Sequence, residues 1–246
     1  MKKTLFALIF AATSFSSSVM AADNEIRFAT EPTYPPFEFV GSNGEKQGFD
    51  IDLANALCSE LKMTCSFHTQ SFDSIIPTLK FHKFDAAISG MDITQARLKQ
   101  VNFTDSYFDN AAVFVTTDPK IKTLADLDGK KVGVQNGTTH QTYILDKLPK
   151  VQQVPYANYQ EAFMDMKSGR VVSVFGDTAV VADIMKKEGT GVHKLGKVIT
   201  DKSYFGNGFG IAVAKDNDKL LKKLNKALVS VKANGTYQKI YAKYFE

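Results

Sequence analysis

The sequence lacks the residue patterns of a metal- or cofactor-dependent enzyme. It contains no tryptophan and only four histidines, which stand in unrelated contexts: His68, His82, His140 and His193. None of them accompanies a serine or cysteine nucleophile motif, whereas a catalytic base needs a second group to orient it. The two cysteines have neither redox nor zinc-site spacing, and no glycine-rich phosphate loop is present. We therefore predict no enzyme activity, no cofactor and no metal.

The sequence also lacks a strong charge excess and any long apolar run beyond its start. Without residues 1–21, the chain keeps 28 of its 30 basic residues against 26 acidic ones, a net charge near +2. The basic residues are dispersed along the chain, which argues against a nucleic-acid partner. No later apolar stretch approaches the roughly 20 residues that a membrane helix needs.

The first 21 residues have the features of a cleaved secretory signal. Lys2 and Lys3 form a basic start, residues 5–12 form a short apolar core, and residues 19–21 end in small side chains. The sequence predicts cleavage after Ala21 and export to an oxidising compartment. Two cysteines in such a compartment predict one disulfide between Cys58 and Cys65, and the alternative is a pair of free buried thiols.

The rest of the chain alternates between short apolar stretches and stretches with helical periodicity. Strands are predicted at 26–30, 65–69, 84–89, 109–117, 130–135, 151–156 and 171–177. Helices are predicted at 48–61, 138–148, 159–169, 178–189 and 218–235, with a helix start within 71–80. This alternation favours an α/β protein of mostly parallel sheets flanked by helices. We predict two lobes, 22–110 with 207–246 and 111–206, joined by two extended strands around a ligand cleft.

The stretch "ISGMDITQAR" (88–97) predicts a binding site for a small anion. Ser89 and Gly90 end a strand, and a short helix is expected from Thr94. The first N–H groups of a helix have no internal partners, and small residues allow an anion to approach them. Arg97 adds a two-pronged donor that matches a carboxylate. The alternative is a capped helix with Arg97 on the surface.

Three further segments supply candidate contacts. Asp177 ends the strand of "FGDTAV" and points toward the predicted cleft, or else it caps the following helix. "VQNGTTH" (134–140) is a strand, turn and helix start that offers further donors. Tyr34 and Phe72 each follow a strand and form two aromatic walls, or else belong to the core. Glu31, at the end of a strand beside them, is a possible counter-charge.

The segment "GFDIDLANALCSEL" (48–61) resembles the signature of the family 3 extracellular solute-binding proteins, the polar amino acid receptors of ABC importers. The resemblance extends through "TYPPFEF", "FDSIIPTLK", "VFGDTAVV", "YFGNGFGIAV" and "NGTYQKIY". Together, "ATE", "YPPFE", "SGMDIT", "VQNGTTHQ" and "FGDTAVV" are most similar to the periplasmic arginine-binding branch.

The resemblance implies a two-lobed, type II periplasmic-binding-protein fold and a role for each candidate. Arg97 would hold the ligand carboxylate, Asp177 its α-ammonium group, and Glu31 the end of its side chain. Asp92 stands where several relatives carry serine and is expected to orient the binding loop, and His140 occupies a position that is glutamine in some relatives. The predicted ligand-binding set is Glu31, Tyr34, Phe72, Ser89, Gly90, Met91, Asp92, Arg97, Gln135, Thr139 and Asp177.

The function implied by the resemblance is capture of L-arginine by a monomeric periplasmic protein that delivers it to an ABC permease in the inner membrane. One alternative is a receptor for lysine, ornithine, histidine or glutamine. A second alternative is a dehydratase-like enzyme on the same fold, since a few proteins of this fold act on small carboxylates.

Overall fold

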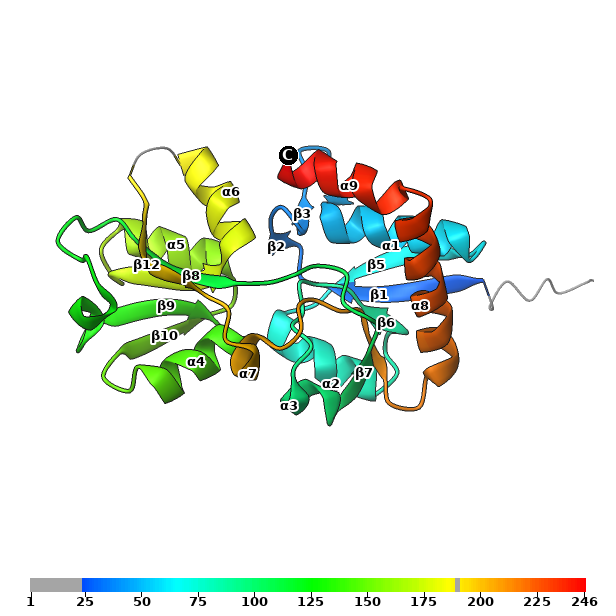
Figure 1. The fold of residues 1–246 in the computed structure, drawn as a ribbon, viewed down its shortest axis with the longest axis horizontal. Helices are drawn as coiled ribbons and strands as arrows, with labels where there is room; N and C mark the ends of the chain where they lie inside the picture. Colours follow the sequence, from blue (N-terminus) through cyan, green and yellow to red (C-terminus); the bar gives the residue numbers. More distant parts are fainter. Residues whose placement is uncertain (1–23, 189–190) are drawn as a thin grey trace, which may run out of the picture.

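The computed structural model describes residues 24–188 and 191–246. The predicted signal peptide and its cleavage site after Ala21 lie outside these residues. Figure 1 shows two lobes, each built on one five-stranded sheet with helices packed against it, as the sequence predicts. Within the described segments, no helix is both long and apolar enough to cross a membrane.

The first lobe is built on a sheet with the strand order β5-β1-β6-β13-β7. Its strands are β1 (Glu25–Thr30), β5 (Thr64–Thr69), β6 (Ala86–Ala87), β7 (Val101–Phe103) and β13 (Ala212–Ala214). Its helices are α1 (Phe49–Glu60), η1 (Phe72–Ser74), α2 (Ile75–Lys80), α3 (Gln95–Leu98), α8 (Asp218–Ala233) and α9 (Thr236–Phe245). A small sheet of β2 (Thr33–Tyr34), β3 (Glu38–Val40) and β4 (Lys46–Gln47) follows β1.

Within this lobe, α1 shows how the sequence directs the fold. Its apolar residues recur at every fourth position, and Phe49, Leu53 and Leu57 are fully buried on one face. Just before it, Gly48 has φ 132° and lies so close to the Phe37 carbonyl that a Cβ would be 2.2 Å from its oxygen. A disulfide joins Cys58 of α1 to Cys65 of β5 with a Cα–Cα distance of 6.0 Å, so the predicted bridge is confirmed.

The second lobe is built on a sheet with the strand order β10-β9-β11-β8-β12. Its strands are β8 (Ala112–Thr116), β9 (Lys131–Gln135), β10 (Gln152–Tyr156), β11 (Ser173–Asp177) and β12 (His193–Ile199). Its helices are η2 (Leu124–Leu127), α4 (Thr139–Lys147), α5 (Tyr159–Lys167), α6 (Thr178–Glu188) and α7 (Lys202–Phe205). β9 runs parallel to β10 and β11, whereas β8 runs antiparallel to β11 and β12. In the first lobe, β1 likewise runs parallel to β5 and β6, and β13 runs antiparallel to β6 and β7. Both sheets are therefore mixed, with three parallel strands on one side.

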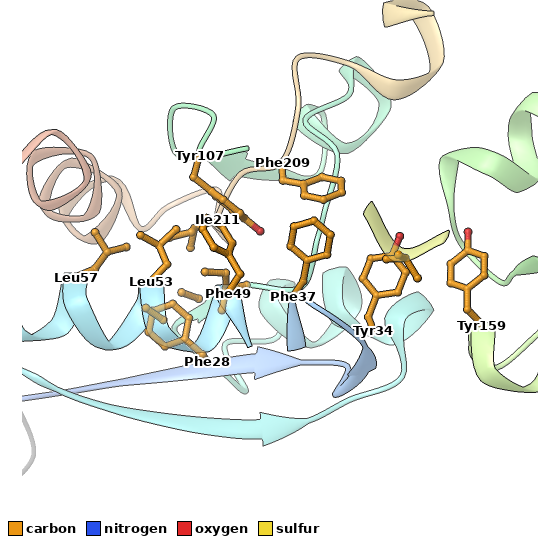
Figure 2. Packing of buried hydrophobic residues seen from close by; sticks show 14 of the residues in the cluster. Phe28, Tyr34, Phe37, Phe49, Leu53, Leu57, Tyr107, Tyr159, Phe209 and Ile211 are labelled. Atoms are coloured by element: carbon orange, nitrogen blue, oxygen red, sulfur yellow. The ribbon is translucent and has the colours of Figure 1, made fainter. Parts of the chain in front are cut away.

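Two extended segments connect the lobes (Figure 1). One leads from β7 to β8, and the other leads from α7 back to β13. They touch through an antiparallel bridge between Phe108 and Phe209, and Phe209 also bridges to Asp92. Figure 2 shows a row of rings from the first-lobe core toward the second lobe, in which Phe209, Phe37, Tyr34 and Tyr159 follow one another. Their neighbouring centroids lie 5.2, 5.9 and 5.4 Å apart, and this packing fixes the Tyr34 ring at the inter-lobe boundary.

Several elements differ from the sequence-based expectation. The strand predicted at 84–89 pairs over only Ala86 and Ala87, because the chain then turns into the binding loop. β12 and α9 were not predicted, since β12 has one buried side chain, Leu195, and α9 has no fully buried residue to mark a periodic face. The helix predicted at 218–235 ends at Ala233, as expected, and Gly235 with φ 80° then begins α9.

Candidate ligand-binding site

A polar cavity lies between the two lobes, where the carboxyl ends of their parallel strands meet. Glu31 follows β1, Asp92 lies five residues after β6, Gln135 ends β9 and Asp177 ends β11. The complete lining is Glu31, Tyr34, Glu38, Phe72, Gly90, Asp92, Arg97, Gln135, Thr138, Thr139, His140 and Asp177. The free space measures about 10 Å³, room for about one water molecule. In this closed arrangement the cavity has no room for a molecule much larger than water.

Arg97 lies inside this cavity, not on the surface. α3 begins after Thr94, whose hydroxyl accepts a hydrogen bond from the Arg97 N–H at 3.2 Å, so the predicted helix cap is present. The guanidinium is nevertheless buried. It donates to the backbone carbonyls of Asp92 and Gly137 at 3.0 and 3.3 Å, and it packs 5.3 Å from the centre of the Phe72 ring. Burial lowers the pKa of Arg97, and the nearby carboxylates of Asp92 and Asp177 oppose that shift.

Asp92 uses both carboxylate oxygens within the protein. Oδ1 accepts from the Asn110 side-chain amide at 2.8 Å, and Oδ2 accepts from the Thr139 hydroxyl at 2.7 Å. Burial raises the pKa of Asp92 to about 6, with a further increase from the Asp177 charge and an opposing effect of Arg97. Because Thr139 belongs to the second lobe, Asp92 links the Arg97 loop to the start of α4.

Asp177 is the counterpart of Arg97 in the second lobe. It is almost completely buried, and its carboxylate accepts hydrogen bonds from the Tyr34 hydroxyl and from the Asn110 side-chain amide, the latter at 2.6 Å. His140 Nε2 lies 3.2 Å from Asp177 Oδ1, and the other ring nitrogen of His140 is 3.1 Å from the Tyr159 hydroxyl. The Asp177 side chain thus points into the cavity, and neutral donors surround it together with one imidazole.

Glu31 places a second carboxylate in the lining. Oε1 accepts from the Thr33 hydroxyl at 2.6 Å, and Oε2 accepts from the Gln135 amide of the second lobe at 3.3 Å. Burial raises the pKa of Glu31, and these two hydrogen bonds oppose the shift. The cavity therefore contains a buried guanidinium from α3 and buried acids from both lobes.

The structure brings together nine of the eleven predicted contact residues. Ser89 and Met91 lie outside the lining: the Ser89 hydroxyl accepts from the Glu31 N–H and donates to Glu38, and Met91 belongs to a buried hydrophobic cluster of the first lobe. Sequence reasoning missed the lining residues Glu38 and Thr138, and it missed Asn110, which binds both Asp92 and Asp177. Glu38 and Thr138 stand in the segments "YPPFE" and "VQNGTTH" but were not singled out there, and Asn110 is an isolated polar residue in a segment without a recognisable motif. His140, at the end of the second segment, also lines the cavity.

Direct hydrogen bonds across the lobe boundary hold the cavity closed. Three of them join residues of the lining: Tyr34 with Asp177, Asp92 with Thr139, and Glu31 with Gln135. Outside the cavity, the Asn136 side chain donates to Asp73 at 2.7 Å. Nowhere in residues 24–188 and 191–246 do three or more His, Cys, Asp or Glu side chains gather as they would around a metal ion. The arrangement suits a small zwitterion, which carries one charge for the cation and one for the acid.

Two α/β lobes joined by two extended connections around a buried polar cavity define a binding protein of the type II periplasmic class. The family model for bacterial extracellular solute-binding proteins, family 3, matches residues 26–246. The chain belongs to this family.

Named relatives support a narrower comparison. The chain is 52% identical to the "Putative ABC transporter arginine-binding protein 2" of Escherichia coli K12, and the alignment covers 100% of both chains. It superimposes with a TM-score of 0.87 on a Salmonella typhimurium periplasmic binding protein described as highly specific for arginine. That protein is 46% identical, and the match covers 91% of this chain and 100% of the other. An ancestral arginine-binding protein bound to arginine gives a TM-score of 0.83 at 43% identity, with 91% and 99% covered.

Proposed function

We propose that the protein is the periplasmic substrate-binding component of an ABC amino acid importer and that it binds L-arginine in the inter-lobe cavity. One observation carries the proposal: Arg97 from the first lobe, Asp177 from the second and Glu31 beside them converge, buried, on a single cavity. The names of the relatives described above agree with it. On this proposal the exported chain, cleaved after Ala21, acts as a monomer and hands its ligand to a membrane permease.

The proposed contacts follow from charge. The ligand carboxylate takes the place opposite Arg97, where the guanidinium is already oriented by two carbonyls and the Phe72 ring. The α-ammonium group takes the place of the Tyr34 hydroxyl at Asp177, because a charged donor forms a stronger hydrogen bond than a neutral one. The side-chain guanidinium then pairs with Glu31, where a planar fork matches a carboxylate.

Closure would follow from these contacts. With the lobes apart, Arg97 and Asp177 face water on opposite walls, and a bound zwitterion pairs with both only when the lobes approach. We propose that the units 22–110 with 207–246 and 111–206 move as bodies about the two connections. Each ligand contact then favours the closed form, which a permease can recognise. The proposal needs no chemical step, since charge pairing and shape are sufficient to bind a ligand and release it unchanged.

Calorimetric titration with the twenty common amino acids, ornithine and citrulline tests the function. We expect arginine to bind most tightly, lysine and ornithine more weakly, and glutamate hardly at all. A preference for glutamine or histidine would refute the arginine assignment and leave the family membership intact. Incubation with arginine followed by NMR should return the amino acid unchanged, and a product that accumulates in proportion to protein would favour the dehydratase-like alternative.

A further inference from the structure

Two acids that the proposed ligand contacts do not use are completely buried behind the binding loop. Glu38 begins β3, and Asp50 lies in the first turn of α1. Each holds one residue of the loop: the Ser89 hydroxyl donates to Glu38 Oε1 at 2.7 Å, and the Gly90 N–H donates to Asp50 Oδ2 at 2.9 Å. Asp50 Oδ2 also accepts from the Tyr107 hydroxyl at 2.8 Å.

Each acid also has a second carboxyl oxygen without a donor. Glu38 Oε2 and Asp50 Oδ1 are buried, and no N–H or hydroxyl group of the described residues donates to either. The two acids are neighbours: the Asp50 N–H donates to the carbonyl of Phe37, the residue before Glu38, at 2.8 Å, and the adjacent loop residues Ser89 and Gly90 each bind one of them. Two ionised carboxylates cannot form a hydrogen bond, and two buried like charges would repel strongly. One proton between the remaining oxygens satisfies both groups.

The surroundings assign this proton to Glu38. Asp50 receives the Gly90 and Tyr107 donors and sits at the positive end of α1, so its ionised form is favoured. Glu38 receives only the Ser89 hydroxyl. Burial, with the neighbouring Asp50 charge, raises the pKa of Glu38 well above its ordinary value, and the Glu31 charge raises it further. Burial also raises the pKa of Asp50, to about 6.

We propose that Glu38 and Asp50 share one proton at neutral pH and that this acid pair holds Ser89 and Gly90 in the conformation that forms the binding loop. Ser89 in turn accepts from the Glu31 N–H at 3.0 Å, so the pair also positions the residue that we assign to the ligand side chain. Gly90 has φ 49°, and a Cβ there would lie 3.0 Å from the Tyr34 ring. The acid pair therefore acts on the site through the loop, and Glu38 also forms part of the cavity wall.

A shared proton has a measurable consequence. The pKa of Glu38 is higher in the folded protein than in the unfolded chain, so the folded state keeps a proton that the unfolded state releases. Stability is then lost as pH rises from the ordinary glutamate range toward the folded pKa of Glu38. Because the two states differ by one bound proton in this range, the unfolding equilibrium constant increases by up to about tenfold per pH unit. Glu38→Gln retains a donor toward Asp50 in the same shape and has nothing to titrate. Two ionised carboxylates would give no such difference between the proteins.

The primary test is carbon NMR of the ligand-free protein with labelled glutamate carboxyl groups, titrated from about pH 5 to about pH 9. We expect one glutamate resonance to stay in the protonated position at neutral pH. It should vanish in Glu38→Gln and persist in Glu31→Gln, the matched control for a second buried glutamate. In Asp50→Asn the neighbouring charge is lost and the new amide donates to Glu38, so this resonance should titrate at a lower pH than in the wild type. If every glutamate titrates near its ordinary pKa in the wild type, the proposal is wrong, whether or not the variants fold.

Folding stability and arginine affinity of the same proteins then test whether the acid pair supports the binding loop. Chemical denaturation at a series of pH values should show the wild type losing stability relative to Glu38→Gln by up to tenfold per pH unit, and parallel curves would overturn the proposal. The affinity arm rests on the proposed function: arginine should bind Glu38→Gln with an affinity that varies less with pH than that of the wild type. A protonated Glu38 in a protein that binds no amino acid would uphold the acid pair and refute the proposed function.

Discussion

Replacement of Glu31 by glutamine tests which group selects the ligand. The α-amino and α-carboxylate groups are common to all amino acids, so on the proposed assignment Asp177 and Arg97 do not discriminate among them. Glu31 is the remaining buried acid that we assign to the ligand side chain. Arginine and citrulline have nearly the same shape, and only arginine carries a charge at the end of its side chain.

The structure allows the size of the effect to be worked out. A buried carboxylate and a guanidinium about 4 Å apart attract each other by about 4 kcal/mol at an effective dielectric constant near 20. Part of this is offset because Glu31 now accepts from Thr33 and Gln135, and the Gln135 bond must rearrange when ligand enters. We expect Glu31→Gln to weaken arginine binding by about 2 kcal/mol, which is about thirtyfold.

Citrulline supplies the control for indirect damage. In Glu31→Gln the new side-chain amide at position 31 faces the Gln135 amide. Any free-energy cost of that contact weakens the binding of arginine and of citrulline equally. Calorimetric titration of the wild type and the variant with both ligands completes a cycle in which this cost cancels. Citrulline should lose less than about 1 kcal/mol, as expected for a neutral hydrogen bond. Equal losses for the two ligands would show that Glu31 has a structural role only.

Three further predictions concern the charges and the disulfide. Asp177→Asn should weaken arginine binding at least a hundredfold, since it leaves the α-ammonium group without its counter-charge, whereas Tyr34→Phe should have a much smaller effect in the same titration. Replacing Cys58 and Cys65 by serine should lower the free energy of unfolding by about 2 kcal/mol in denaturant titrations, because their separation of 7 residues closes only a short loop. The pKa of Asp92 is raised to about 6 in the folded protein. The protonated Asp92 side chain therefore contributes fully to folding stability below the ordinary aspartate pKa, and this contribution is lost as pH rises through about 6. Asp92→Asn should therefore lose less stability than the wild type between about pH 4 and about pH 6, and identical pH profiles would contradict this assignment.

The parts of the fold with strong periodicity could be predicted from the sequence. α1 was predicted because its apolar residues recur at every fourth position, and the bridge from Cys58 to Cys65 because exported cysteines pair. β12 could not be predicted, since Leu195 is its one buried side chain and the edge position leaves most of its residues at the surface. Periodicity reports burial, so elements that bury little carry little signal.

The charged residues of the site could be predicted from the sequence, but the hydrogen bonds between them and residues distant in sequence could not. Arg97 was predicted because it follows a strand end with small residues, Ser89 and Gly90. Asp177 was predicted because it ends a strand just before a helix. The hydrogen bonds that Asp92 accepts from Asn110 and Thr139 join residues 18 and 47 positions apart in the chain, and the bond from Thr139 crosses the boundary between the lobes. Glu38 and Asp50 could not be paired from the sequence either, because their burial depends on α1 packing against the start of β3 within the first lobe.

On the proposed assignment, the contacts inside the closed cavity determine which ligand gains the most free energy by binding. Each charged group assigned to the ligand already has a partner in the protein: Asp177 has Tyr34 and Asn110, and Glu31 has Thr33 and Gln135. A ligand therefore gains only the difference between its own contacts and the ones that it displaces. A neutral side chain exchanges one neutral hydrogen bond for another at Glu31 and gains little. A guanidinium exchanges neutral donors for a charged, two-pronged one, so the largest net gain in free energy belongs to arginine.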